Sequence, residues 1–548
     1  MCHGFPLARK PLKGNHIRPF RLFRELPMAV RPLRNVLLIV ADQWRGDCLS
    51  ALGHPCARTP NLDALASEGT LFRRHYGQAS PCGPARASLL TGMYLQNHRS
   101  VANGTPLDAR HTNLALEARR FGHAPALFGY TDTSPDPRGR DPGDPALRSY
   151  EGVMAGFDPV CSLTESIEPW AEHLRARGYL VPEPARAIYR AAEPFGPAAY
   201  RAEDSDTAFL ADRLIGWLKG GEGKPWFALA AFIRPHPPWV APAPYHDLID
   251  PATTPPAARA VDWTAEGKQH PWLAWHLARQ KTDCWMEGEA VDPRVLDAAT
   301  LARLRATYHG LIAELDTQIG RIIDHLRQTG ALDDTLVIVT SDHGEMLGEH
   351  WMLGKSGYFD EAYHVPLIIR DPDRLGGGVI DAFTEHVDLM PTILDWLDGT
   401  SPTHPPAQCD GRSLAPLLSG AVPADWRSHA HWEFDFRDVI GGETERALGL
   451  RPGQCVLNVL RGERYKYVHF AALPPLFFDL AEDPGQFRDL AADPAHAALV
   501  RDHAQALLSW RMENDERVLA NTLLTADGVF SRGETRGPDM PKGAESPL

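Results

Sequence analysis

Two unbroken aliphatic runs restrict most strongly what this chain can fold into. The first covers Asn35–Ala41 and the second Thr335–Thr340. Runs of this kind are typical of strands covered on both faces, as in the interior of a parallel α/β sheet. A segment at about 296–329, whose apolar residues recur at three- and four-residue steps, predicts a long helix. Strands alternating with helices indicate an open α/β fold with its ligand site at the carboxyl ends of the strands.

Composition excludes several classes of function. The 548 residues carry 56 basic and 70 acidic side chains, a formal net charge of −14, which argues against a nucleic-acid or anionic-membrane partner. No apolar run approaches the ~20 residues of a membrane-spanning helix. The eight cysteines form no CxxC pair, so we expect neither a disulfide framework nor a zinc knuckle. A cytoplasmic protein is expected, with a targeting signal in the basic first thirty residues as the alternative.

The pattern along the chain divides it into three parts. Residues 1–31 are predicted to be an N-terminal extension, and residues 32–425 a catalytic α/β domain. Insertions rich in Pro, Asp and Arg are expected in this domain at 134–200 and 240–298. Short alternating and aromatic runs then predict a small antiparallel sheet. Residues 426–548 are therefore expected to form a C-terminal subdomain and an oligomerisation tail, although an apolar helix stripe is more often part of the chain's own core.

Polar side chains follow both aliphatic runs. Asp42 and Gln43 come directly after the first run, and Asp342 and His343 come shortly after the second. Carboxylate, amide and imidazole groups that converge at strand ends suit a divalent cation such as Ca²⁺, Mg²⁺ or Mn²⁺, and the imidazole favours Mn²⁺ weakly. On these residues alone the alternative stays open that Asp42 and Asp342 only cap the turns that follow them.

A third cluster carries the most specific signal. The segment Cys82–Gly92 reads CGPARASLLTG. It fits C-x-P-x-R-x4-T-G, the signature by which sulfatases of the alkaline phosphatase superfamily have a cysteine converted to formylglycine. A short helix is predicted over Ala85–Thr91, so Cys82 would precede a helix start, where unpaired N–H groups favour anions. The other seven cysteines are expected to be small buried hydrophobic residues.

The resemblance to this family extends over most of residues 32–490. Within the family the chain is most similar to the phosphonate monoester hydrolases, which also hydrolyse sulfate monoesters and phosphodiesters. The stretches that carry this likeness are Asp42–Trp44, Cys82–Tyr94, Arg234–Trp239 and Tyr465–Asp479. Ordinary sulfatases tend to have Asp and Asn where this chain has Gln43 and His343, which favours the phosphonate-hydrolase branch. The implied fold is alkaline-phosphatase-like, an α/β fold with a large mixed sheet flanked by helices and a smaller C-terminal antiparallel sheet.

The resemblance implies a complete set of site residues and cofactors. The implied metal ligands are Asp42, Gln43, Cys82 as formylglycine, Asp342 and His343. The implied catalytic residues are Cys82, Arg86, His236 and Lys355, and the implied substrate-binding residues are Asn103, Tyr130 and Asp132. Arg86 would point back to hold the modified Cys82. The cofactors would be formylglycine and one divalent ion, with Mn²⁺ or Ca²⁺ favoured.

The same resemblance implies an activity. The chain would hydrolyse phosphonate monoesters, phosphodiesters and aryl sulfate monoesters. One hydroxyl of the hydrated aldehyde would attack phosphorus or sulfur, and deprotonation of the other would expel the product by C–O cleavage. The implied partners are a small anionic ester, a formylglycine-generating maturation enzyme, and further copies of the chain in a homodimer or homotetramer. Two alternatives remain, a dedicated arylsulfatase with side activity on phosphorus and a metal-dependent phosphodiesterase with an unmodified nucleophile.

One position departs from the pattern of the related hydrolases. They read Thr-Thr-Thr where this chain reads Thr131-Asp132-Thr133. A carboxylate at that place would repel an anionic substrate unless it were protonated or paired, and Arg138 and Arg140 are the candidate partners. The resemblance therefore does not fix the preferred substrate.

Overall fold

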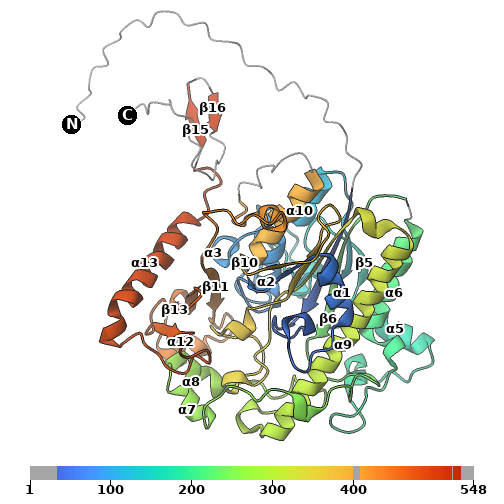
Figure 1. The fold of residues 1–548 in the computed structure, drawn as a ribbon, viewed down its shortest axis with the longest axis horizontal. Coiled ribbons are helices and arrows are strands. Elements are labelled where there is room, and N and C mark those ends of the chain that lie inside the picture. The colour runs from blue at the N-terminus through green and yellow to red at the C-terminus, as the bar shows by residue number, and fades with distance from the viewer. Residues whose placement is uncertain (1–33, 222, 399–407, 521, 527, 532–548) are drawn as a thin grey trace, which may run out of the picture. The chain divides into compact units, whose positions relative to one another are not determined.

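An eight-stranded mixed sheet runs through the centre of the molecule (Figure 1). The computed structural model describes residues 34–221, 223–398, 408–520, 522–526 and 528–531, so the predicted extension at 1–31 lies outside the described residues. The strand order is β5-β4-β6-β1-β7-β8-β2-β9, and β8 runs antiparallel to both of its neighbours. The strands are β1 (Asn35–Asp42), β2 (Thr70–Phe72), β4 (Ala126–Gly129), β5 (Asp158–Ser162), β6 (Phe227–Pro235), β7 (Thr335–Ser341), β8 (Leu367–Arg370) and β9 (Gly378–Ile380).

Helices on both faces of this sheet account for the unbroken aliphatic run of β1. Leu37 and Ile39 join one hydrophobic core, whereas Leu38 and Val40 join the core on the opposite face, because successive side chains of a strand point in opposite directions. The first core includes side chains of α1 (Pro60–Glu68), α5 (Glu168–Ala176), α6 (Asp206–Gly220) and α9 (Ala298–Gln328). The second includes side chains of α2 (Cys82–Thr91), α4 (Leu114–Arg120) and α10 (Leu389–Asp398). The predicted fold class is confirmed.

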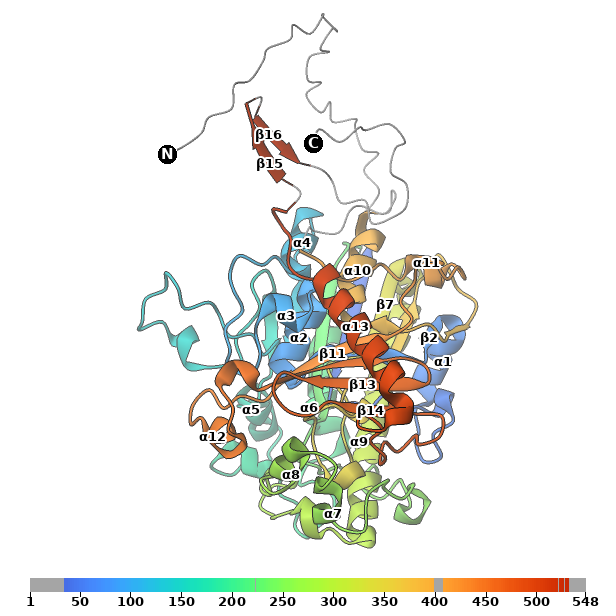
Figure 2. The ribbon, with the colours of Figure 1, turned by 90° about the vertical axis from the view of Figure 1, so that its left-hand side faces the viewer.

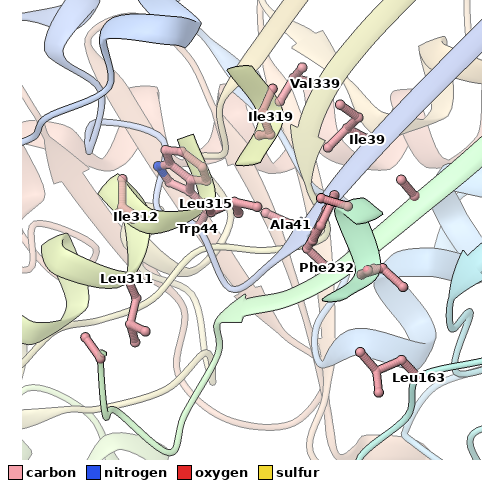
Figure 3. Packing of buried hydrophobic residues seen from close by; sticks show 14 of the residues in the cluster. Ile39, Ala41, Trp44, Leu163, Phe232, Leu311, Ile312, Leu315, Ile319 and Val339 are labelled. Atoms are coloured by element: carbon pink, nitrogen blue, oxygen red, sulfur yellow. The ribbon is translucent and has the colours of Figure 1, made fainter. Parts of the chain in front are cut away.

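The long helix α9 is a major part of the first core. Its 31 residues confirm the helix predicted at about 296–329, and the Asp297 side chain caps its start by accepting a hydrogen bond from the Thr300 N–H. Figure 3 shows Leu315 and Ile319 of this helix among the buried side chains of the first core, together with Trp44, the second residue after β1. Packing against α9 therefore fixes the segment that leaves β1.

Helix α2 begins earlier than the sequence pattern predicts. The expected start was Ala85, whereas the helix runs from Cys82 to Thr91. Pro84 is compatible with this start because the first N–H groups of a helix have no partner within it. The Ala85 N–H donates to the carbonyl of Pro81 at 3.1 Å, which closes the first turn. Cys82 is thus the first residue of the helix rather than a residue before it.

The two segments predicted as insertions have different positions in the fold. The segment 134–200 supplies the edge strand β5, which pairs in parallel with β4, a contribution that its sequence pattern did not indicate. The segment 240–298 contains the short helices α7 (Trp263–Gly267) and α8 (Pro271–Leu277). Trp272 of α8 packs edge-to-face on Phe434 of the C-terminal sheet, with 5.9 Å between the ring centroids.

The predicted small antiparallel sheet is present near the C-terminus. Its strands lie in the order β11 (Ala430–Asp435), β12 (Val456–Arg461), β13 (Tyr465–Phe470) and β14 (Leu476–Asp479). Figure 2 shows α13 (Ala497–Glu513) lying across this sheet. Leu507 of α13 is buried there with Tyr467 and Phe477, whereas Leu508 is exposed. Most of the apolar stripe predicted in this helix therefore packs within the chain, and the boundary near residue 425 stays a prediction.

Short elements complete the described fold. The remaining α-helices of the described residues are α3 (Leu95–His98), α11 (Ala415–Leu418) and α12 (Glu443–Leu448). Two pairs of short strands are β3 (His75–Tyr76) with β10 (Thr384–Glu385), and β15 (Thr522–Thr525) with β16 (Gly528–Ser531). Among the helices of the described residues, none is both long and apolar enough to span a membrane.

Candidate active site

Two neighbouring parallel strands place two carboxylates side by side. Ala41 of β1 pairs with Ser341 of β7, so Asp42 and Asp342, the next residue of each chain segment, meet at the same edge of the sheet. Both side chains are fully buried. The Gln43 N–H donates to Asp342 Oδ1 at 3.1 Å and fixes the turn that leaves β1. The convergence expected from the sequence is therefore present.

Cys82, the first residue of helix α2, lies next to this pair of carboxylates. Cys82 Sγ lies 3.8 Å from Asp42 Oδ1 and 3.3 Å from His343 Nε2. Ligand atoms of Asp42, Cys82, Asp342 and His343 all lie within 4.8 Å of one another. The Gly83 N–H, in the first turn of α2, donates to Asn103 Oδ1 at 2.9 Å, which places Asn103 beside Cys82.

Arg86, one helical turn after Cys82, holds both carboxylates. Its Nε donates to Asp342 Oδ2 at 3.0 Å and one terminal nitrogen donates to Asp42 Oδ2 at 3.1 Å. The other terminal nitrogen donates to the carbonyl of Tyr130 at 3.2 Å, and the guanidinium carbon lies 4.2 Å from the centre of the Tyr130 ring. The Tyr130 hydroxyl in turn donates to Asp42 Oδ2 at 2.6 Å. The contacts of Arg86 in the structure are thus with the two carboxylates and Tyr130, and the predicted contact with the modified residue 82 stays a prediction.

Lys355 reaches the same point from the loop after β7. Its Nζ lies 3.0 Å from Cys82 Sγ and donates to Gln43 Oε1 at 2.9 Å. Although burial alone would lower the pKa of Lys355, its interactions with Cys82, Asp42 and Asp342 raise it. The Lys355 side chain therefore stays protonated and positively charged next to Cys82.

Glu345 is a site residue to which the sequence analysis gave no role. Its Oε2 accepts a hydrogen bond from the Gln43 amide nitrogen, so the Gln43 amide oxygen turns towards Lys355. Its Oε1 accepts from the N–H groups of Leu347 and Gly354, at 2.9 and 2.7 Å. Glu345 therefore orients Gln43 and also holds the loop that carries Lys355. Its position in the polar run after β7 was the only signal for it.

The donor atoms fit a divalent cation. Burial, and then the neighbouring Asp42 carboxylate, raise the pKa of Asp342, because both disfavour a second negative charge at this place. Two carboxylates, an amide oxygen and an imidazole nitrogen form a ligand set for a hard or borderline ion. A cation bound by these groups would offset their mutual repulsion, because opposite charges at short range favour ionised carboxylates.

His236 lies close to this charge cluster as a neutral imidazole. Burial and the positive charge of Lys355 lower the pKa of His236 to about 4, against the opposing effect of Asp42. Its Nδ1 lies 2.7 Å from the carbonyl of Pro237, so Nδ1 carries the proton and donates it. The other ring nitrogen, Nε2, then carries no proton and can accept a hydrogen bond.

Asp132 is buried, and neither Arg138 nor Arg140, the candidate partners from the sequence, forms an ion pair with it. Arg138 instead pairs with Asp136 and Asp108, and Arg140 pairs with Asp144. Burial raises the pKa of Asp132 to about 7, with Arg86 opposing this shift and Asp42 adding to it. The expectation of an arginine partner is wrong, because the arginines are taken by closer carboxylates. The raised pKa favours the other expectation, a protonated Asp132.

Comparisons with known proteins place the chain in a family. A family model described as Sulfatase matches residues 34–400. The chain belongs to the sulfatase family. A second model, described as N-sulphoglucosamine sulphohydrolase, C-terminal, matches residues 348–513 of this sulfatase family member. Membership implies hydrolysis of an ester, a bound metal ion and a formylglycine, and the four-residue cluster around Cys82 is a possible metal site.

Several relatives are similar over almost their whole length. The multifunctional alkaline phosphatase superfamily protein PehA of Trinickia caryophylli is 44% identical over 91% of this chain and 99% of that protein. An arylsulfatase of Clostridium perfringens is 26% identical over 88% of this chain and 95% of its own. The crystal structure of a phosphonate monoester hydrolase of Agrobacterium radiobacter superposes with a TM-score of 0.87 at 49% identity, covering 91% of this chain and 99% of that one. One from Silicibacter pomeroyi gives 0.86 at 44% identity, with the same coverages.

The raised pKa of Asp132 predicts a pH-dependent KM for a monoanionic ester. Below pH 7 the side chain is protonated and neutral, and above pH 7 it becomes negative and repels the substrate. We expect KM for an aryl sulfate to rise up to about fivefold between about pH 6 and about pH 8, since a repulsion of about 1 kcal/mol has that effect. Asp132→Asn should abolish this rise.

The matched control is Asp141→Asn, which changes an exposed carboxylate in the segment that follows. It should keep the wild-type pH profile. A profile of KM that is unchanged by Asp132→Asn would contradict the assignment of the pH dependence to this carboxyl.

Proposed function

We propose that the chain hydrolyses phosphonate monoesters, phosphodiesters and aryl sulfate monoesters, with formylglycine 82 as its nucleophile. The observation that carries the proposal is the position of Cys82, at the first turn of α2, between His343 Nε2 at 3.3 Å and Lys355 Nζ at 3.0 Å. The likeness to solved phosphonate monoester hydrolases at 44–49% identity supports the preference for phosphonates over a dedicated sulfatase activity.

Formylglycine would supply chemistry that no unmodified side chain has. Its hydrate carries two hydroxyls on one carbon, one to attack the ester and one whose deprotonation expels the acid by C–O cleavage. Because the phosphorus or sulfur atom is attacked once only, one site can release products of different charge and geometry. The alternative with an unmodified nucleophile lacks this second hydroxyl.

The neighbouring residues of this chain would position and neutralise the reacting groups. Lys355 lies within 3.0 Å of Cys82 Sγ and would offset negative charge on the oxygens of the ester. Neutral His236 presents Nε2, which can take up a proton from the modified residue when the product leaves. Asn103 fixes the first turn of α2 through the Gly83 N–H. Arg86 would hold both carboxylates in place and offset part of their negative charge rather than touch the substrate.

A divalent ion, Mn²⁺ or Ca²⁺, is the proposed metal. Asp42, Gln43, residue 82, Asp342 and His343 would hold it, and the ion would supply positive charge that lowers the pKa of a bound hydroxyl and polarises the ester. The carboxylates and the amide oxygen suit both ions, while the His343 imidazole favours Mn²⁺.

The activity is tested with one aryl group carried on three esters, a phenylphosphonate monoester, a phosphodiester and a sulfate. We expect turnover of all three by protein in which residue 82 has lost about 18 Da relative to cysteine, with kcat/KM highest for the phosphonate. Cys82→Ser should lose at least about 1,000-fold in kcat on each substrate. The variant keeps a hydroxyl of similar size but has no second hydroxyl.

Two results would overturn this proposal in different ways. If kcat/KM is highest for the sulfate, the chain is a dedicated arylsulfatase with side activity on phosphorus. If protein with an unmodified Cys82 mass is as active as the converted protein, the nucleophile is not formylglycine. Cys284→Ser, which alters a half-buried cysteine outside the Cys82 cluster, is the matched control and should keep full activity.

Metal removal gives an independent prediction. Dialysis against a chelator should abolish turnover, because the positive charge that would lower the pKa of the attacking hydroxyl and polarise the ester is then lost. Adding back Mn²⁺ should restore more activity than Ca²⁺, given the imidazole ligand. Activity that persists after the metal content has fallen below about 0.1 ion per chain would contradict the metal requirement.

We also propose that the protein assembles as a homodimer or homotetramer. Exposed apolar residues on α13 support an interface there, with Leu508 at 60% and Met512 at 58% exposure. Light scattering coupled to gel filtration should give two or four times the 60.5 kDa chain mass. A monomer mass at micromolar concentration would refute the assembly.

A further inference from the structure

A second cluster of potential metal ligands lies outside the candidate active site. Cys48 and His54 belong to the segment that follows β1, and His309 belongs to α9. One ligand atom from each of the three lies within 4.8 Å of the others. Neither the resemblance nor the residues of the candidate active site assign these side chains a role. The sequence pattern also missed them, because one ligand is more than 250 residues from the other two.

His309 brings a ring nitrogen without a partner to the cluster, whereas Cys48 and His54 have weak contacts that an ion would replace. Cys48 Sγ lies 3.4 Å from Asp47 Oδ1, and His54 Nδ1 accepts from the Ala57 N–H at 3.3 Å. His309 is 2% exposed, and its Nδ1 has no hydrogen-bond partner among the described residues. Its ring centroid lies 4.5 Å from that of His54. Burial, and then the nearby His54, lower the pKa of His309 to about 3, so its ring is neutral. Cys48 is fully buried beside these rings.

The donor types favour a different ion from that of the candidate active site. One thiolate sulfur and two imidazole nitrogens form a soft to borderline set, which zinc prefers, whereas the carboxylates at Asp42 and Asp342 suit harder ions. A second sulfur lies close by, since Cys56 Sγ is 3.6 Å from His54 Nδ1. Zinc binds sulfur at about 2.3 Å and nitrogen at about 2.0–2.1 Å, so small side-chain movements would close the site.

We propose that Cys48, His54 and His309 bind a zinc ion. Cys48 loses its thiol proton to solvent on binding, and both histidines bind as neutral rings. His54 is partly exposed and provides the route by which the ion enters. This site is independent of the proposed ester hydrolysis.

The place of the cluster in the fold gives the ion a structural task. The Cys48 carbonyl accepts a hydrogen bond from Trp44 Nε1 at 3.0 Å. The Tyr308 hydroxyl, next to His309, donates to the Gln43 carbonyl at 2.7 Å. A zinc ion shared by Cys48 and His309 would therefore clamp the segment that begins at Gln43 onto α9.

Cobalt substitution tests the site without any measurement of activity. The experiment uses full-length Cys82→Ser protein, in which the sulfur of the candidate active site is absent. Titration with Co²⁺ should give a thiolate-to-metal charge-transfer band that saturates at one ion per chain, and Zn²⁺ should displace it. Adding Cys48→Ser should remove the band, and adding His309→Gln should weaken Co²⁺ binding at least about tenfold. Adding Cys284→Ser, the matched control, should leave the band unchanged.

Two outcomes would overturn the zinc site. One is the absence of a charge-transfer band in Cys82→Ser protein, and the other is a band that survives the further change Cys48→Ser. Should the buried changes prevent folding, His54→Gln takes their place, because His54 is partly exposed. It should weaken Co²⁺ binding at least about tenfold and remove the rise in Tm that Zn²⁺ gives to the Cys82→Ser parent. An unchanged Co²⁺ affinity in His54→Gln would likewise overturn the proposal.

Discussion

The ion pairs from Arg86 to Asp42 and Asp342 are the interaction on which the candidate active site depends. Both carboxylates are buried at the ends of neighbouring strands, where Arg86 offsets part of the cost of their negative charge. Removing one member of a buried pair of this kind typically costs about 3–5 kcal/mol, because the remaining charge is left uncompensated. The same guanidinium belongs to the helix that starts at Cys82, so charge neutralisation and the position of Cys82 are coupled.

A second set of contacts fixes the loop after β7 and the end of β1 relative to each other. Glu345 accepts hydrogen bonds from the Gln43 amide and from backbone N–H groups of the loop around Gly354. This carboxylate turns the Gln43 amide oxygen towards Lys355 and holds the loop residue next to Lys355 in place. Glu345 has no contact with Cys82 among the described residues, yet it sets the positions of Gln43 and Lys355.

The sequence predicted the sheet, the long helix α9 and the residues that converge on Cys82, because buried strands and a fixed-spacing motif leave strong local patterns. It could not predict the partners of Arg86 or Asp132, since these depend on which side chains from distant segments come within hydrogen-bond distance. The sequence also did not predict that α2 starts at Cys82. A proline commonly marks the first turn of a helix, and the pattern alone does not show that the helix begins two residues before Pro84. His309 lies over 250 residues from Cys48, and no spacing rule links them.

The burial of Cys82 has a consequence for the order of events during synthesis. Its side chain is 5% exposed and sits beneath Lys355 and the ends of β1 and β7, which are contributed by segments some 300 residues apart. An enzyme that converts Cys82 would need access to this side chain before the segments that bury it come together. Conversion would then precede folding, and Cys82 in a molecule that folded first would stay a thiol.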